Sequence, residues 1–194
     1  KIQSTANEYI HLVNSYLHDN ISLEDENSMA TYSVGGLILS NSGMITSNYW
    51  LSEVYDAQIT NAHKNGDLYI HNINMLTGCS AGWSLEDLIL KGLPSVNKMI
   101  SSLPAKHLST LCNQMVNFLG IMQNEWASAQ SFAHFDTLLV PFIHQDKLSF
   151  KMVSDCLESF IYGINIPSRW GTQAPFSQIT LDWNVPQEFI NKKA

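Results

Sequence analysis

Apolar residues recur at helical spacing along much of this chain. The longest such stretch, residues 106–126, carries one apolar stripe, and Cys112 and Phe118 widen it. The stripe consists of Leu108, Leu111, Met115, Leu119 and Met122. Residues 149–164 repeat the pattern with Phe150, Val153, Leu157, Phe160 and Ile164. Spacing of three and four residues is typical of amphipathic helices, so we expect two long helices here.

Shorter helices are expected at residues 6–17, 46–64 and 84–91. The second of these is followed by Asn65-Gly66, a pair that favours a left-handed helix cap. The third begins with Ser84 and a capping-box pattern, and Lys91-Gly92 ends it. Both boundaries are predicted from local chemistry alone.

Other apolar stretches are shorter and indicate strands. Residues 31–43 hold the pair Gly35-Gly36 within an apolar run, and residues 67–73 alternate as a strand would. Residues 165–183 are expected to form a strand, a loop and a second strand, whereas residues 132–143 are helix or strand. Strands separated by helices predict an α/β fold with a heavily helical middle.

Composition limits what the chain can bind. Only 14% of the 194 residues are charged and the net charge is −7, which argues against a nucleic-acid partner because phosphate binding needs clustered Lys and Arg. A surface with so little charge is often covered by a partner subunit or by the rest of a longer chain. No apolar run approaches the roughly 20 residues of a membrane span. Three widely spaced cysteines do not form a disulfide framework, and they favour the cytoplasm.

The candidate chemical groups are few. His63, His71 and Cys79 are spaced too evenly for a compact zinc motif, so we expect no metal site. Cys79 is either a small buried hydrophobe or a reactive thiol before a helix N-terminus, and the residues alone leave both readings open. Cys112 and Cys156 lie on apolar helix faces and are expected in the core. Residues 168–173 form either a loop that grips a phosphorylated ligand or a surface turn.

Five segments in order resemble one family. They are ENSMATYSVGGL (26–37), HKNGDLYIHN (63–72), GCSAGWSLEDL (78–88), QMVNFLGIMQNEWASAQSF (114–132) and NIPSRWGTQAPFSQITLDW (165–183). Together they resemble the anaerobic (class III) ribonucleoside-triphosphate reductases, which are glycyl-radical enzymes. The resemblance covers residues 8–190, and five segments in order are far more specific than any one of them.

The resemblance implies a fold and a reaction. The fold is the first half of a ten-stranded α/β barrel with a large helical portion, so residues 1–194 would form a single partial domain. The family reduces ribonucleotides to deoxyribonucleotides. A radical S-adenosylmethionine activase makes the glycyl radical, a thiyl radical takes the 3′-hydrogen of the ribose, and formate or a protein dithiol supplies electrons. Members bind ATP or deoxynucleotide effectors and form homodimers.

The resemblance also implies roles for particular residues. Cys79 matches the family's reducing cysteine, on the face of the ribose opposite the thiyl. His63 matches a histidine near the reductant in formate-using members, where a group that titrates near neutral pH can handle protons. Asn27, Ser28 and Ser33 match part of the substrate pocket.

The resemblance places several functional parts outside residues 1–194. The thiyl cysteine, the glycyl-radical loop and the zinc cysteines would follow residue 194, and an ATP cone, where a member has one, would precede residue 1. We therefore expect a piece of a longer polypeptide that is inactive without its C-terminal half. Two alternatives remain: a non-catalytic remnant that binds nucleotides or subunits, and a glycyl-radical enzyme for another substrate.

Overall fold

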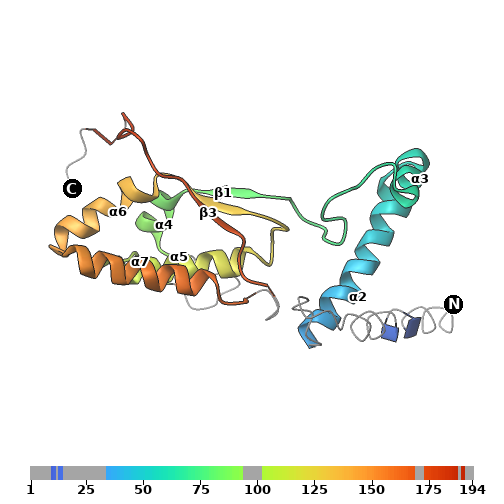
Figure 1. Cartoon of the computed structure of the whole chain (residues 1–194), viewed down its shortest axis with the longest axis horizontal. Helices are drawn as coiled ribbons and strands as arrows, with labels where there is room; N and C mark the ends of the chain where they lie inside the picture. The colour runs from blue at the N-terminus through green and yellow to red at the C-terminus, as the bar shows by residue number, and fades with distance from the viewer. Residues whose placement is uncertain are drawn as a thin grey trace. The chain divides into compact units, whose positions relative to one another are not determined.

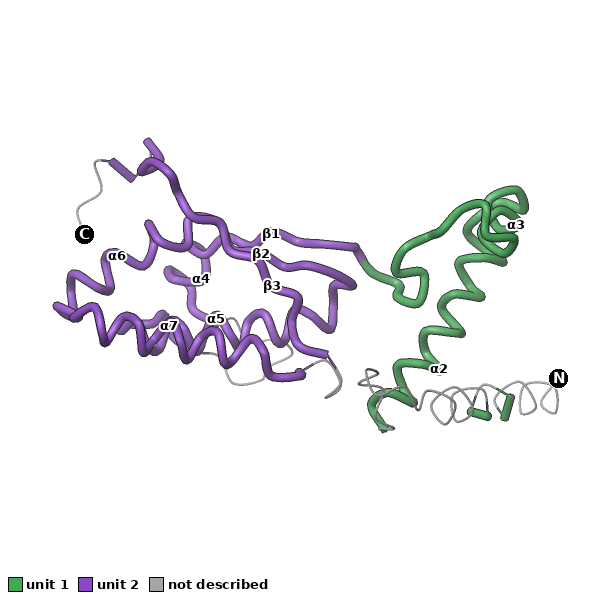
Figure 2. The backbone as a smooth tube through the Cα atoms, viewed as in Figure 1, with its two compact units in different colours: residues 1–77, 170–172 green, residues 78–169, 173–194 purple. Residues whose placement is uncertain are grey.

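The structure is a computed structural model that describes residues 10, 11, 13, 14, 34–93, 102–168, 173–187, 189 and 190. The chain forms two compact units (Figure 2). The first holds residues 1–77 and 170–172, and the second holds residues 78–169 and 173–194. Each is described by itself, and the expectation of a single partial domain stays a prediction. None of the helices in the described ranges is long and apolar enough to cross a membrane.

The first unit is helical where it is described. It contains α2 (Val34–Tyr49), the π-helix η1 (Trp50–Val54) and α3 (Ala57–Asn65). The strand predicted for residues 31–43 is therefore wrong over its described part. The apolar run around Gly35-Gly36 continues through polar residues as one helix of 16 residues, because a short apolar run does not distinguish a strand from a helix segment.

The caps of α3 follow the predicted chemistry at its C-terminal end. Gly66 is the C-cap with φ of 84°, a left-handed conformation that glycine adopts without a steric penalty, so the predicted Asn65-Gly66 end is confirmed. At the other end the Asp56 carboxylate accepts a 2.9 Å hydrogen bond from the N–H of Ile59. The strand predicted at 67–73 is wrong, because this segment is a loop with turns whose first N–H groups donate to Ala62.

The second unit is built on a small parallel sheet (Figure 1). The sheet contains β1 (Ala81–Trp83), β2 (Gln130–Phe132) and β3 (Ser177–Ile179) in that order. Its register pairs Ala81 with Gln130 and Gln130 with Ser177. The β1–β2 connection contains α4 (Leu85–Lys91) and α5 (Leu108–Met122), and the β2–β3 connection contains α6 (Phe135–Gln145) and α7 (Phe150–Ile164). The predicted α/β class is confirmed for this unit.

The core lies between the sheet and these helices. Phe118 of α5 contacts the rings of Trp83 and Phe132 at centroid distances of 5.2 and 5.7 Å, so α5 packs against the sheet. Phe135 and Phe160 join α6 to α7 at 5.5 Å. The predicted α5 stripe is buried at all positions except the partly buried Met122. Helices predicted at 84–91, 106–126 and 149–164 are thus confirmed.

The predictions for residues 132–183 were confirmed in part. The helix that was one alternative for residues 132–143 is present as α6, which begins at Phe135, and Phe132 is the last residue of β2. Of the strand, loop and strand expected in 165–183, the described residues contain only β3. Phe150 was placed in the apolar stripe of α7, yet it is 90% exposed at the first position of the helix.

Candidate functional site

Cys79 lies directly before β1, where the chain runs beside residues 126–128. Gly78 and Trp126 form a parallel bridge. The N–H of Ala127 donates to the Gly78 carbonyl over 3.0 Å, and the N–H of Ser128 donates to the Cys79 carbonyl over 2.6 Å. These bonds extend the pairing of β1 toward its N-terminal end, so the backbone of Cys79 is held by the strand next to it.

The Cys79 thiol is at the surface of its unit. The side chain is exposed, and the Ser80 hydroxyl donates to Cys79 Sγ over 3.7 Å. The buried-hydrophobe alternative is therefore wrong. The helix N-terminus alternative is also wrong, because β1 separates Cys79 from Ser84, whose side chain caps α4 through the N–H of Asp87. An exposed thiol beside a strand end remains available to react with a ligand.

His63 lies in the last turn of α3 in the first unit. Its Nδ1 is 3.2 Å from the carbonyl of Leu68 and 3.4 Å from the N–H of Ile70, and the tautomer decides which of the two bonds forms. Its ring packs on Tyr69, which packs on His71 in turn. The loop 67–71 thus orients His63. Because Cys79 belongs to the second unit, their sharing of one site stays a prediction.

The other predicted pocket residues lie outside the described residues. These are Asn27, Ser28 and Ser33, together with residues 169–172 of the proposed phosphate-gripping loop. Among the residues that the structure describes, no group of three or more His, Cys, Asp and Glu side chains could hold a metal ion. His63, His71 and Cys79 therefore do not belong to such a group among the described residues.

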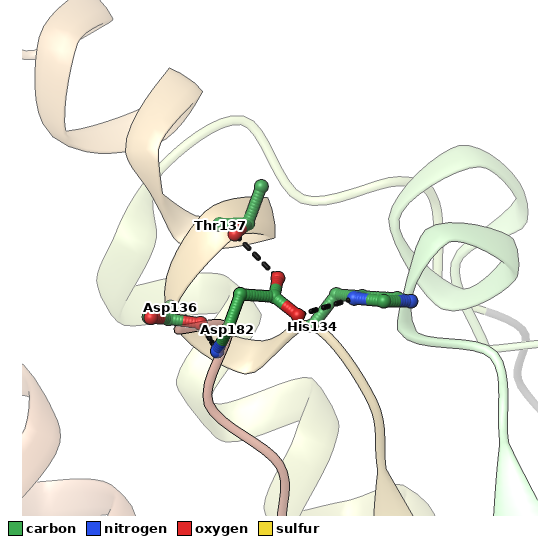
Figure 3. A network of polar contacts seen from close by, with 4 residues as sticks. All are labelled: His134, Asp136, Thr137 and Asp182. Carbon is green, nitrogen blue, oxygen red and sulfur yellow. Dashed lines mark hydrogen bonds and ion pairs between the residues drawn. The ribbon is translucent and has the colours of Figure 1, made fainter. Parts of the chain in front are cut away.

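A polar network lies after the carboxyl ends of β2 and β3 (Figure 3). Asp182 accepts from Thr137 Oγ1 over 2.5 Å and pairs with His134 Nδ1 over 2.8 Å, while its own N–H donates to Asp136 Oδ1 over 3.0 Å. The Thr137 hydrogen bond is the largest cause that lowers the pKa of Asp182, and the hydrogen bond and charge of His134 act in the same direction. Asp182 is therefore a carboxylate at neutral pH.

A groove of about 570 Å³ lies beside this network. Asp136, Thr137 and Asp182 line it together with residues of α4, α6 and the segment after β3. Those further residues are mainly apolar and include Leu90, Val140, Trp183 and Phe189. Its acidic groups are Glu86, Asp136 and Asp182, and none of the described residues that line it is Lys or Arg.

Sequence reasoning did not single out His134 or Asp182. One available signal is that each follows a strand that ends in an apolar residue, Phe132 in β2 and Ile179 in β3. Polar residues after parallel strands gather at one edge of a sheet, where α/β proteins often bind ligands. The positions of His134 and Asp182 stand out only after β2 and β3 have been located, and the sequence alone did not locate β2.

The other two cysteines are shielded, as expected. Cys112 of α5 is 1% exposed, and burial, with a smaller contribution from Cys156, raises the pKa of its thiol from 9.0 to about 12. Cys156 of α7 is partly buried, and burial, followed by the charge of Asp155, raises its pKa as well. Among the three cysteines, Cys79 alone is exposed.

Comparison with known families decides the relationship. The family model for anaerobic ribonucleoside-triphosphate reductase matches residues 26–193, which is most of the chain. The chain belongs to this family. No curated protein matches.

Solved anaerobic ribonucleotide reductases from Thermotoga maritima have the same fold. A structure with citrate in the active site shares 18% identity with this reductase-family chain, with a TM-score of 0.67 over 89% of this chain and 33% of that one. A structure with dATP bound in the specificity site shares 20% identity, with a TM-score of 0.64 over 89% of this chain and 32% of that one. A complex with dATP and CTP shares 22% identity, with a TM-score of 0.62 over 74% of this chain and 27% of that one. This chain therefore spans about a third or less of the length of those reductases.

Proposed function

We propose that this chain is the N-terminal part of an anaerobic ribonucleoside-triphosphate reductase and that Cys79 is its reducing cysteine. The family match over residues 26–193, which includes Cys79, supports the proposal most directly. The exposed thiol at the head of β1 is consistent with a sulfur that faces a substrate. In the complete enzyme the sheet continues into a ten-stranded barrel, and β1 is its first strand.

The chemistry at Cys79 is a one-electron reduction. The glycyl radical, held outside residues 1–194, supplies the radical that activates the ribose at C3′, and the 2′-hydroxyl leaves as water. The Cys79 thiol then gives one hydrogen atom, a proton and an electron, to the substrate radical. The sulfur becomes oxidised by one electron, and the substrate is left as a 3′-ketone. Formate or a dithiol supplies two electrons in all: one, with a proton, returns Cys79 to the thiol, and the other, with a proton, reduces the 3′-ketone to a 3′-radical. That radical takes back its hydrogen from the thiyl cysteine and so restores the thiyl radical. The net change replaces the 2′-hydroxyl by hydrogen.

His63 handles the proton of the reductant in this proposal. Its Nδ1 is engaged by the backbone of the 67–71 loop, so the ring is oriented and Nε2 is the nitrogen that can exchange a proton with a ligand. Asn27, Ser28 and Ser33 complete the substrate pocket.

The partners follow from the same assignment. They are the C-terminal half of the reductase, a radical S-adenosylmethionine activase, a second copy of the reductase and nucleoside triphosphates as substrates and effectors. We expect no metal within residues 1–194, no nucleic-acid partner and no membrane partner. Three cysteines without a disulfide are compatible with the cytoplasm, where we place the protein.

Complementation tests this function. The chain is combined under strict anaerobiosis with the remaining part of the reductase, the activase, a ribonucleoside triphosphate and either formate or a dithiol. Deoxynucleotide that forms only in the complete mixture supports the proposal. Saturable nucleotide binding by calorimetry without deoxynucleotide in any mixture would instead support the non-catalytic alternative.

A further inference from the structure

The position of Cys79 depends on a close contact one residue earlier. A Cβ at Gly78 would overlap the six-membered ring of Trp126, so the indole occupies the space that any other side chain at position 78 would need. The same two residues form the parallel bridge that precedes the hydrogen bond from Ser128 to Cys79. The Trp126 ring and the backbone hydrogen bonds from Ala127 and Ser128 therefore both restrain the Gly78–Cys79 segment.

Trp126 is itself supported from the core. Its ring meets that of Trp83 edge to face, with centroids 5.9 Å apart. Trp83 Nε1 donates to Gln130 Oε1 over 3.0 Å, and Gln130 Nε2 donates to the Leu119 carbonyl over 3.4 Å. Gln130 is only 1% exposed. Its two hydrogen bonds therefore connect Trp83, and through it Trp126, to Leu119 of α5.

We propose that Trp126 is a positioning residue for Cys79: its indole packs on Gly78 and holds the following peptide against residues 127–128, which confines Cys79 Sγ. The inference rests on the proposed role of Cys79 and adds the residue that keeps its sulfur in place. A hydrogen-atom transfer needs its atoms aligned, and a displacement of about 1 Å can lower its rate about a hundredfold.

Loss of the ring has a defined physical consequence. Without the ring, Gly78 loses the three atoms that lie nearest to the position of a Cβ there, and the peptide bonds on either side gain freedom because glycine has few steric limits. The bonds that Ala127 and Ser128 donate to Gly78 and Cys79 then open more often. Because these bonds position the sulfur, we expect turnover to fall while KM changes little.

The test compares Trp126→Ala and Trp126→Phe with Phe150→Ala as a control for loss of an aromatic ring, since the Phe150 side chain is 90% exposed. In the completed reductase we expect Trp126→Ala to lower kcat at least about tenfold with KM within about twofold. Trp126→Phe, which keeps a flat ring on Gly78, should restore most of kcat, and Phe150→Ala should leave both constants unchanged. Unchanged kcat in Trp126→Ala, or equal losses in the Ala and Phe variants, would overturn the inference.

A second measurement does not require turnover. Amide hydrogen exchange of the 194-residue chain should accelerate at Ala127 and Ser128 in Trp126→Ala and return toward the wild-type rate in Trp126→Phe. If Trp126→Ala fails to fold, Trp126→Leu takes its place under the same criteria. Failure of wild-type complementation would remove the proposed function but leave the exchange result to judge the packing. Exchange rates that do not respond to the substitution would remove the positioning role alone.

Discussion

His134 Nδ1 lies 2.8 Å from Asp182 Oδ1, although 48 residues separate the two along the chain. The pair joins the residue before α6 to the segment that follows β3 (Figure 3). His134 has φ of 55°, a left-handed conformation that is uncommon outside glycine. The His134–Asp182 hydrogen bond and the adjacent bond from Thr137 therefore hold an unusual turn at the carboxyl edge of the sheet.

The Asp182 network predicts a specific dependence of stability on acid pH. The folded-state pKa of Asp182 lies below its ordinary value of 3.8, so the unfolded chain takes up the proton first as pH falls. The contribution of Asp182 is thus complete above about pH 4 and disappears as pH falls through the lower, folded pKa. Asp182→Asn should reduce the urea midpoint at pH 6 and flatten its decline below pH 4, measured by circular dichroism.

A matched control is Asp155→Asn, because Asp155 makes only an exposed ion pair with Lys151 one helical turn away. Its urea midpoint should remain close to wild type across the same pH range. An acid decline of Asp182→Asn as steep as that of wild type would contradict the assignment.

Cysteine labelling should follow burial. At pH 8 iodoacetamide should modify Cys79 first, Cys156 more slowly and Cys112 only on unfolding, because thiolates react and burial raises the pKa of the last two. Peptide mass spectrometry at timed intervals gives the order. Labelling of Cys112 as fast as that of Cys79 in the folded chain would be incompatible with the packing of α5 on α7.

The same burial predicts a loss of stability in alkali. The Cys112 pKa is about 12 in the folded state against 9.0 ordinarily, so its contribution is complete below pH 9 and falls as pH rises toward 12. The slope from this one group is at most about 1.4 kcal/mol per pH unit. Cys112→Ala should remove this part of the slope in urea unfolding between pH 9 and 11, and Cys79→Ala should not.

Substitutions of Trp83 and Gln130 should have non-additive effects on stability, because their side chains share a hydrogen bond. Trp83→Phe leaves the buried Gln130 Oε1 without its donor, which we expect to destabilise the chain by about 1–3 kcal/mol. The double variant Trp83→Phe/Gln130→Leu should regain part of that loss, because both polar partners are then gone. Urea unfolding of the wild type, Trp83→Phe, Gln130→Leu and the double variant completes this double-mutant cycle. Strictly additive losses of stability would show that the hydrogen bond contributes nothing.

Two phenylalanines of α7 provide a direct test of the core. Phe160 is 1% exposed and Phe150 is 90% exposed. Phe160→Ala should lower the free energy of unfolding by about 3–5 kcal/mol, whereas Phe150→Ala should change it by no more than about 0.5 kcal/mol. Similar losses in the two variants would mean that a different face of α7 is buried.

Local chemistry explains which elements could be predicted from the sequence. The ends of α3 and α4 follow from Gly66 and Ser84, whose conformational and hydrogen-bonding roles need only neighbouring residues. The α5 stripe is long enough for its period to be unambiguous. By contrast, the apolar run at the start of α2 is short, and its length does not distinguish a strand from the helix that the chain forms.

The site was predictable only in part, because contacts between distant residues carry no local signal. The proposed role of Cys79 came from a resemblance to a family. The family match confirms that resemblance, and the role stays a proposal. The contact of Trp126 with Gly78 and the pairing of His134 with Asp182 depend on how the strands align, and neither residue stands out in the sequence. Similarly, the alternation in residues 67–73 looked like a strand, whereas the loop turns back on the end of α3 and His63.

The most direct measurement of the central claim uses Cys79→Ser in the completed reductase, with Cys156→Ser as its control. After activation, electron paramagnetic resonance should detect the glycyl radical in both variants. Deoxynucleotide should form in Cys156→Ser at close to the wild-type rate and be absent in Cys79→Ser. Wild-type amounts of deoxynucleotide from Cys79→Ser, with the radical present, would contradict the assignment of Cys79 as the reducing cysteine.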